Sequence, residues 1–167
     1  LELLMAMTIL AIAVGAFMSL YASSAVSLRT ASISGNALTL VERQMEAYRT
    51  LVYADLGVSA STVPAAGTTY FTVRPTAVSS GFTNVSAGAT TSSECIAPTD
   101  PLPGCARQTI TGPDNRSYII DSYVLAQTPS GGRAGRQISV VVRLTSDTTG
   151  SIRGQATSAF DAASSTP

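Results

Sequence analysis

The residue types available for chemistry limit the functions open to this chain. Its ten basic residues are all arginine, and it contains neither lysine nor histidine. Histidine-based acid–base catalysis, Ser-His-Asp triads and histidine metal ligands are therefore excluded. No nucleophile–base pair or pair of acids stands at a meaningful spacing, so we expect a protein that is not an enzyme and has no cofactor. Ten acidic residues balance the arginines, and no basic excess predicts nucleic-acid binding.

The two cysteines of the chain, Cys95 and Cys105, form its clearest covalent motif. Nine residues separate them, in a proline-rich stretch typical of a loop. This spacing predicts a disulfide, and with it an oxidising compartment. Two free thiols, or part of a metal site, are the alternatives.

Two further motifs concern modification and ion binding. Asn84 and Asn115 each begin an Asn-X-Ser triplet, the acceptor pattern for N-linked glycosylation, although ordinary polar loops contain the same triplet. Asp114 and Asn115, with Asp121 or Asp100, offer the oxygen ligands that calcium prefers. Because turns favour the same residue types, we predict a turn here and no metal site.

Residues 1–28 form the element that must position the rest of the chain. Their only charged residue is Glu2, and the next is Arg29. About 20 apolar residues span a bilayer core of roughly 30 Å, and in lipid the backbone must form a helix. A cleavable signal peptide has a shorter apolar region after a basic start, so it fits poorly. A plain signal anchor is the alternative, but it leaves Glu2 unexplained.

Glu2 is unusual because it lies near the end of an apolar helix. An unpaired charge in lipid costs at least about 2.5–3.5 kcal/mol. The free N–H groups of a helix N-terminus favour an anion. A positive charge on a neighbouring copy of the chain would be a better partner.

The first seven residues, Leu-Glu-Leu-Leu-Met-Ala-Met, resemble the segment after the cleavage site of type IV pilins and type II secretion pseudopilins. The pattern of that family reads FTL[LI]ELL[VM]A, followed by a long apolar stretch. Glu2 matches the acidic residue of the pattern. The resemblance implies three further residues before Leu1, the first of them an N-methylated aromatic. It is specific over roughly the first 30 residues and only architectural beyond them.

This resemblance implies a subunit that polymerises through its N-terminal helix. Glu2 would neutralise the N-terminal amine of the adjacent subunit, and Gly15 would be a flexible point of the helix. The implied partners are copies of the chain, an inner-membrane assembly platform and the prepilin peptidase. The subunit would wait in the inner membrane before joining an extracellular filament or a periplasm-spanning pseudopilus. The apolar residues expected in the filament core include Leu1, Leu3, Leu4, Met5, Met7, Leu10, Val14 and Phe17.

Three roles stay open at this stage. A major pilin would form surface fibres for adhesion, motility or DNA uptake. A pseudopilin or minor pilin would serve a short secretion filament or a specialised position in a fibre. A single-span, membrane-anchored periplasmic binding domain is an alternative from a different class.

The sequence predicts one long helix, 1–54, with a membrane or filament-core half, 1–28, and an amphipathic half, 29–54. Apolar residues in the second half recur at offsets of three and four, as on a helix face that packs on a domain. We expect Gly57 to follow the helix end. The stripe comprises Ala37, Leu40, Val41, Met45, Tyr48, Leu51 and Val52.

Residues 55–167 predict a globular β-sheet head. A strand is expected at 70–74, an irregular stretch at 76–111, and three further strands at 117–125, 136–144 and 152–160. An antiparallel meander of these strands on the helix stripe gives an α+β fold. Tyr118 and Tyr123 have opposite parity in their strand, so we expect one in the core and the other on the surface.

Overall fold

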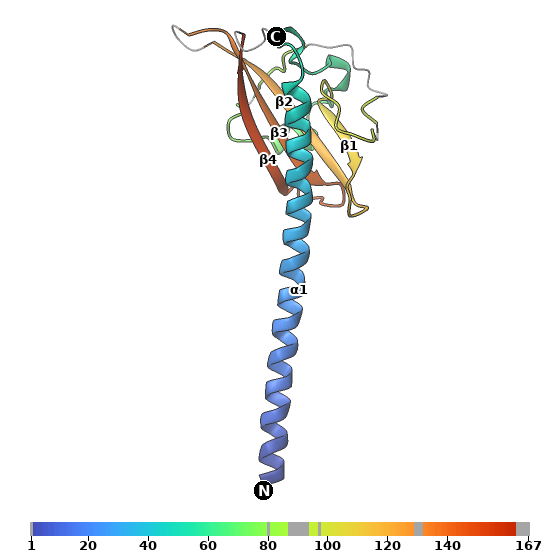
Figure 1. The fold of residues 1–167 in the computed structure, drawn as a ribbon, viewed down its shortest axis with the longest axis vertical. Helices are drawn as coiled ribbons and strands as arrows, with labels where there is room; N and C mark the ends of the chain where they lie inside the picture. Colours follow the sequence, from blue (N-terminus) through green and yellow to red (C-terminus); the bar gives the residue numbers. More distant parts are fainter. Residues whose placement is uncertain (1, 80, 87–93, 97, 129–131, 163–167) are drawn as a thin grey trace. The chain divides into compact units, whose positions relative to one another are not determined.

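The computed structural model describes residues 2–79, 81–86, 94–96, 98–128 and 132–162. Helix α1 (Glu2–Arg49) comes first in the chain, and four strands follow in the C-terminal part of the sequence (Figure 1). The strands form one antiparallel sheet in the order β1-β2-β3-β4, which confirms the predicted α+β fold and meander. They are β1 (Arg107–Thr111), β2 (Ser117–Gln127), β3 (Gly135–Leu144) and β4 (Ile152–Asp161). The chain forms two compact units, Leu1–Gly35 and Asn36–Pro167.

Helix α1 ends at Arg49, a few residues before the predicted end at 54. The chain then forms a short 3₁₀ helix, Tyr53–Asp55, so Gly57 does not follow the end of α1 as predicted. Arg136 of β3 holds the segment that follows α1. Its guanidinium lies 4.7 Å from the ring centre of Tyr53 and donates hydrogen bonds to the carbonyls of Ala54 and Leu56. These tertiary contacts fix a non-helical backbone that helix propensity alone does not predict.

Within the second unit, α1 packs on one face of the sheet. Gln44 donates to the hydroxyl of Ser122 on β2, and Gln108 of β1 donates to the side-chain oxygen of Gln44. The predicted stripe is confirmed except at its end, where Leu51 is half-buried and Val52 is exposed. The residues that α1 buries are Ala37, Leu40, Val41, Gln44, Met45 and Tyr48.

The other face of the sheet is covered as well. Tyr70 stacks on Tyr123 of β2 with ring centres 4.6 Å apart, and Phe82 packs edge-on against the same ring at 5.4 Å. Tyr118, on the opposite face, is also fully buried. The prediction that one of the two β2 tyrosines lies on the surface is therefore wrong, because residues on each side of the sheet exclude water from it.

Two local predictions in the head are also wrong. The strand expected at 70–74 is a single helical turn, α2 (Thr69–Thr72), which buries Tyr70 while its backbone bonds locally. Strand β1 lies in the stretch expected to be irregular. Its signals were the alternating buried residues Gln108 and Ile110, and the turn after it, where Asn115 has a φ of 57°.

A single glycine permits the close contact between α1 and the edge strand β4. Gly154 is buried, and a Cβ atom on it would lie 3.1 Å from the carbonyl carbon of Ala37 and 3.2 Å from its oxygen. These are backbone atoms of a helix, so they cannot move aside as the end of a flexible side chain can. Any side chain at this position would force the helix and the sheet apart.

We expect Gly154→Ala to lower the free energy of unfolding by about 1–3 kcal/mol, the usual range for overpacking. Urea denaturation of the full chain in detergent measures this change. Gly35→Ala is the matched control, because Gly35 is helical and an added Cβ there meets nothing within 4 Å. That control should be neutral or slightly stabilising. Equal stability of the Gly154→Ala variant and the original chain would contradict the close contact.

Candidate functional site

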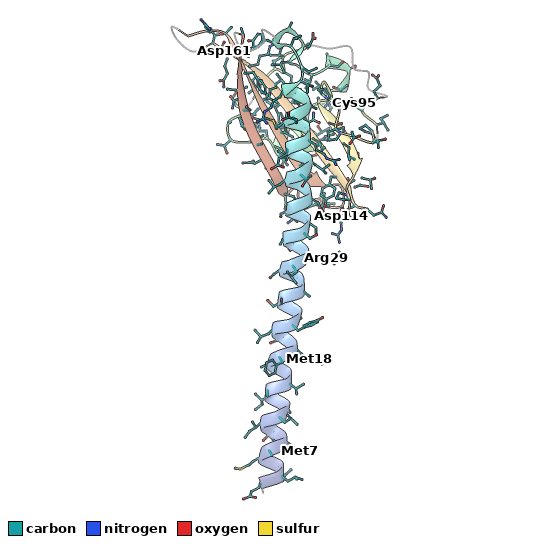
Figure 2. The ribbon with its side chains drawn as sticks, in the orientation of Figure 1. Met7, Met18, Arg29, Cys95, Asp114 and Asp161 are labelled. Carbon is teal, nitrogen blue, oxygen red and sulfur yellow. A yellow bond between two sulfur atoms is a disulfide. The ribbon has the colours of Figure 1, made fainter. Side chains whose placement is uncertain are left out.

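The apolar part of α1 that belongs to the first unit carries the most distinctive surface. An 18-residue window of the helix has a mean hydropathy of 2.3, and none of that window is buried within the chain. The helix is long and apolar enough to cross a membrane. Met7 and Met18 are labelled along it in Figure 2, where side chains are drawn along this part of the helix. Apolar surface of this extent requires either lipid or protein to cover it.

The predicted filament-core residues all lie on this surface, except Leu1, which is outside the described residues. The others are between 48% and 73% exposed: Leu3, Leu4, Met5, Met7, Leu10, Val14 and Phe17. Ile9, Ile12 and Met18 are similarly exposed. Among the described residues, none covers these side chains, and their assembly role stays a prediction.

Hydroxyl groups in this half of α1 bond to the helix itself. Thr8 donates to the carbonyl of Met5 at 2.8 Å, and Ser19 to that of Ala16 at 2.9 Å. The hydroxyls of Ser27 and Thr30 bond to carbonyls four residues earlier at 3.0 and 3.1 Å. A hydroxyl satisfied in this way needs no water, so these residues suit an apolar environment.

Glu2 lies in the first turn of α1 and is exposed. Across the described residues, no ion pair or hydrogen bond engages its carboxylate. The position near a helix N-terminus favours its charge. Gly15, predicted as a flexible point, lies within continuous helix with open space around it.

The predicted disulfide between Cys95 and Cys105 is confirmed, with a Cα–Cα distance of 5.8 Å. Both cysteines are buried. The loop that the bridge closes is tied to the helix and the sheet through Leu102. Its carbonyl accepts from Gln44 at 3.1 Å, and its N–H donates to Gln108 at 3.0 Å.

A buried charge cluster lies on the sheet face opposite α1, and sequence reasoning missed it. Arg107 binds both carboxylate oxygens of Asp121, at 2.6 and 3.0 Å, and Arg143 binds one of them at 2.6 Å. Asp121 is fully buried and Arg143 is 2% exposed. These bonds join β1, β2 and β3 and occupy the oxygens that calcium would need. The described residues contain no group of three or more acids, cysteines or histidines that could hold a metal ion.

The two Asn-X-Ser motifs occupy different environments. The Asn84 amide donates to the Tyr70 hydroxyl at 2.8 Å and accepts from the Val124 N–H at 3.0 Å, so it acts as part of the fold. Asn115 is exposed on the turn between β1 and β2. Glycosylation stays a prediction, and the exposed Asn115 is the more accessible acceptor.

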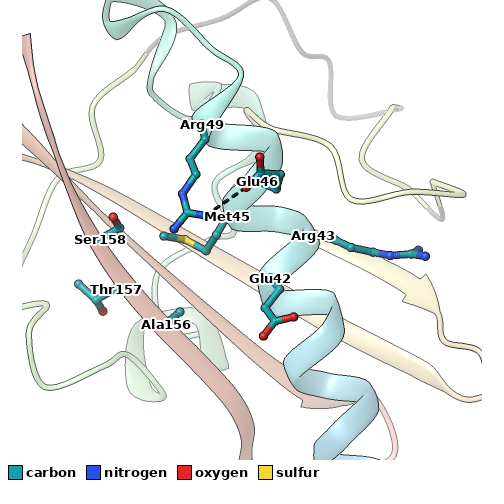
Figure 3. Close-up of a pocket in the computed structure, with 8 residues that line it drawn as sticks. All are labelled: Glu42, Arg43, Met45, Glu46, Arg49, Ala156, Thr157 and Ser158. Carbon is teal, nitrogen blue, oxygen red and sulfur yellow. Dashed lines mark hydrogen bonds and ion pairs between the residues drawn. The ribbon is translucent and has the colours of Figure 1, made fainter. Parts of the chain in front are cut away.

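A groove of about 630 Å³ lies between the second half of α1 and β4 (Figure 3). On the helix side, Glu46 forms an ion pair with Arg49 one turn away, at 3.1 Å, while Arg43 points away from the strand and pairs with Asp100 at 3.4 Å. The helix contributes Glu42, Arg43, Met45, Glu46 and Arg49, and the strand contributes Ala156, Thr157 and Ser158. Sequence reasoning did not predict this groove, because it depends on the packing of α1 beside an edge strand.

Comparisons with known proteins do not assign the site. No protein-family model, curated protein or solved structure matches the chain. Its function therefore has to be argued from residues and geometry.

Loss of the disulfide should destabilise the head. Closing a loop of about ten residues stabilises a fold by about 2–3 kcal/mol in the loop-entropy estimate, so the paired substitution of Cys95 and Cys105 by alanine should lower the melting temperature. Calorimetry with and without a reductant measures this change. In the alanine variant the reductant should have no effect. An unchanged melting temperature of the original chain under full reduction would show that the bridge does not support the fold.

Alkaline pH should unfold the head through its buried tyrosines. Burial raises the pKa of Tyr48, Tyr70, Tyr118 and Tyr123 above the ordinary value of 10.0, that of Tyr118 to about 12. Above pH 10 the unfolded chain loses these protons while the folded chain retains them, so stability is full below pH 10 and falls as pH rises toward 12. Tyrosinate absorbance and circular dichroism, recorded together, should change in one step for these residues. Their gradual ionisation in a chain that stays folded would contradict the burial.

Proposed function

We propose that this chain is a structural subunit of a type IV pilus-like filament, and that it polymerises through the apolar half of α1. The observation that carries the proposal is a long apolar helix that is uncovered in its own chain and has one carboxylate near its tip. The similarity of residues 1–7 to the pilin N-terminal segment supports the same role. In this proposal the chain carries no catalytic chemistry.

The length of the apolar half favours a protein environment in addition to lipid. Residues 2–28 span about 40 Å at 1.5 Å per residue, whereas a bilayer core needs roughly 30 Å. Neighbouring helices of identical copies can cover the whole length. Close packing against them also stabilises the exposed methionine, leucine and phenylalanine side chains through dispersion contacts. The inner membrane would hold the subunit before assembly, with a prepilin peptidase and an assembly platform as its partners.

Glu2 gives the packing an axial register. In a bundle of apolar helices its carboxylate would lie at low effective dielectric, where an unpaired charge is costly and an ion pair is strong. The N-terminal amine of a neighbouring copy is a partner of the required charge. Only one axial offset between two helices brings these groups together, so the pair would select that offset.

The head fits an oxidising location outside the cytoplasm. Its disulfide is formed, and residues on both sides of the sheet bury most of β2 and β3 within the chain. These features suit a surface fibre used in adhesion, motility or DNA uptake. They also suit a type II secretion pseudopilin or a minor pilin, which would use the same helix in a shorter filament.

A second candidate is a single-span, membrane-anchored periplasmic binding domain. The membrane-spanning length of α1 and the groove beside β4 favour it. The two candidates differ in their dependence on Glu2, because an anchor needs lipid but no register with other copies.

Replacement of Glu2 tests the proposal. We expect Glu2→Gln and Glu2→Ala to leave the level of subunit in the membrane unchanged, while the sheared filament fraction falls at least about tenfold, because a buried amine would lose its partner. Immunoblots of both fractions and negative-stain microscopy measure this. Asp55→Asn is the matched control, since Asp55 is an exposed acid outside α1. Normal filaments from both Glu2 variants, or none from the original chain, would defeat the proposal.

A further inference from the structure

Arg29 is a solitary cation directly after the apolar half of α1. It is the only charged residue between Glu2 and Glu42. This interval contains nearly all of the apolar stretch that is long enough to span a membrane. Its side chain is exposed, and among residues 2–79 and the other described segments no ion pair or hydrogen bond involves it. Figure 2 marks its place on the helix. In water this arrangement has little cost, but bundled helices would remove that water.

Glu42, 13 residues further along the same helix, is a carboxylate that could pair with such a cation. It lines the groove beside β4, and in the described part of the chain it has no ion-pair partner. Figure 3 shows its carboxylate directed away from the pair that Glu46 forms with Arg49. Because Arg43 turns to Asp100, the groove retains one uncompensated negative charge. A cation from outside the chain would therefore be favoured in it.

We propose that Arg29 of one copy binds Glu42 of a neighbouring copy, in the groove between α1 and β4. This inference rests on the proposed filament function and identifies a second contact of the same assembly. The occupant is a second copy of the chain because charge complementarity links two groups that the chain itself leaves unpaired. Glu2 is assigned to an amine and Glu46 is already paired, so Glu42 is the carboxylate left on α1.

The lining of the groove suits an arginine side chain. Met45 and Ala156 offer apolar surface for the three methylene groups, and arginine commonly buries this part while its charged end stays polar. The hydroxyl oxygen of Ser158 can accept a guanidinium N–H group that Glu42 does not bind. A guanidinium has five N–H donors, so a hydroxyl acceptor beside a carboxylate favours arginine over other cations.

The pair also gives a stagger between copies. Arg29 and Glu42 are 13 residues apart on α1, which is about 20 Å along a helix at 1.5 Å per residue. Two parallel copies in which these residues meet would therefore be offset by about 20 Å along the filament axis. This offset is a distance that a filament reconstruction measures directly.

Charge exchange tests the pair. We expect Arg29→Glu and Glu42→Arg each to reduce the sheared filament fraction at least about tenfold, and the double variant to return it to within about twofold of the original chain. Arg133→Glu, a reversal at an exposed arginine of the head, is the matched control and should assemble normally. Resistance of the membrane-bound subunit to trypsin establishes that each variant is folded.

A cross-link provides an independent readout. Arg29→Cys combined with Glu42→Cys should give oligomer ladders with a short bis-maleimide, whereas Thr30→Cys with Glu42→Cys should not, because Thr30 is turned by about 100° around the helix. Single reversals that assemble normally, a double variant no better than either single one, or no ladder would overturn the pair. If Glu2→Ala still abolishes filaments in that case, the filament function stands without this contact. If the original chain forms no filaments, both proposals fall.

Discussion

The close contact between α1 and the sheet is the constraint on which the head depends. Gly154 brings the backbone of β4 against Ala37, and a few residues later Gln44 enters a polar network with Gln108 and the backbone of Leu102. Apolar contacts alone would tolerate a helix that slides or rotates. Buried amides are satisfied in only one arrangement, because an unpaired buried amide is costly. The glycine therefore sets the distance between helix and sheet, and the glutamines set the position along it.

The second face of the sheet is built from different interactions. Tyr70 and Tyr123 stack there, and Asp121 binds two arginines from neighbouring strands. Such a buried ion cluster contributes little net stability compared with apolar packing, but removal of one member would leave an uncompensated charge. The sheet is thus held by apolar packing and amides on its helix side, and by aromatic rings and ions on the other. Together these contacts bury most of β2 and β3, whereas most residues of the edge strand β4 stay partly or fully exposed.

The sequence was sufficient where signals were local or periodic. The length and hydropathy of residues 1–28 predicted the helix, strand-like runs predicted β2, β3 and β4, and the spacing of two cysteines predicted their bridge. The misassigned features depend on distant contacts. Arg136 holds the non-helical segment after α1, and Tyr70 lies in a helical turn where a strand was predicted; each contacts residues more than 50 positions away. The Asp121 cluster joins three strands, and the groove beside β4 requires the packed fold. For the proposed assembly surface, the sequence predicts the apolar residues and Glu2, and the structure adds that they are exposed.

The hydroxyl bonds inside the apolar half of α1 have a mechanical consequence. Because Thr8, Ser19, Ser27 and Thr30 direct their protons to their own helix, they offer a neighbour almost no directional contact. In the proposed filament, these four hydroxyls would therefore fix a neighbouring helix less firmly than groups free to bond across the interface would. In such a bundle, the few charged groups would be the main contacts that fix the axial position of one helix relative to its neighbour. Strength against axial pulling would then concentrate at those few points, while bending and twisting between them stay easy.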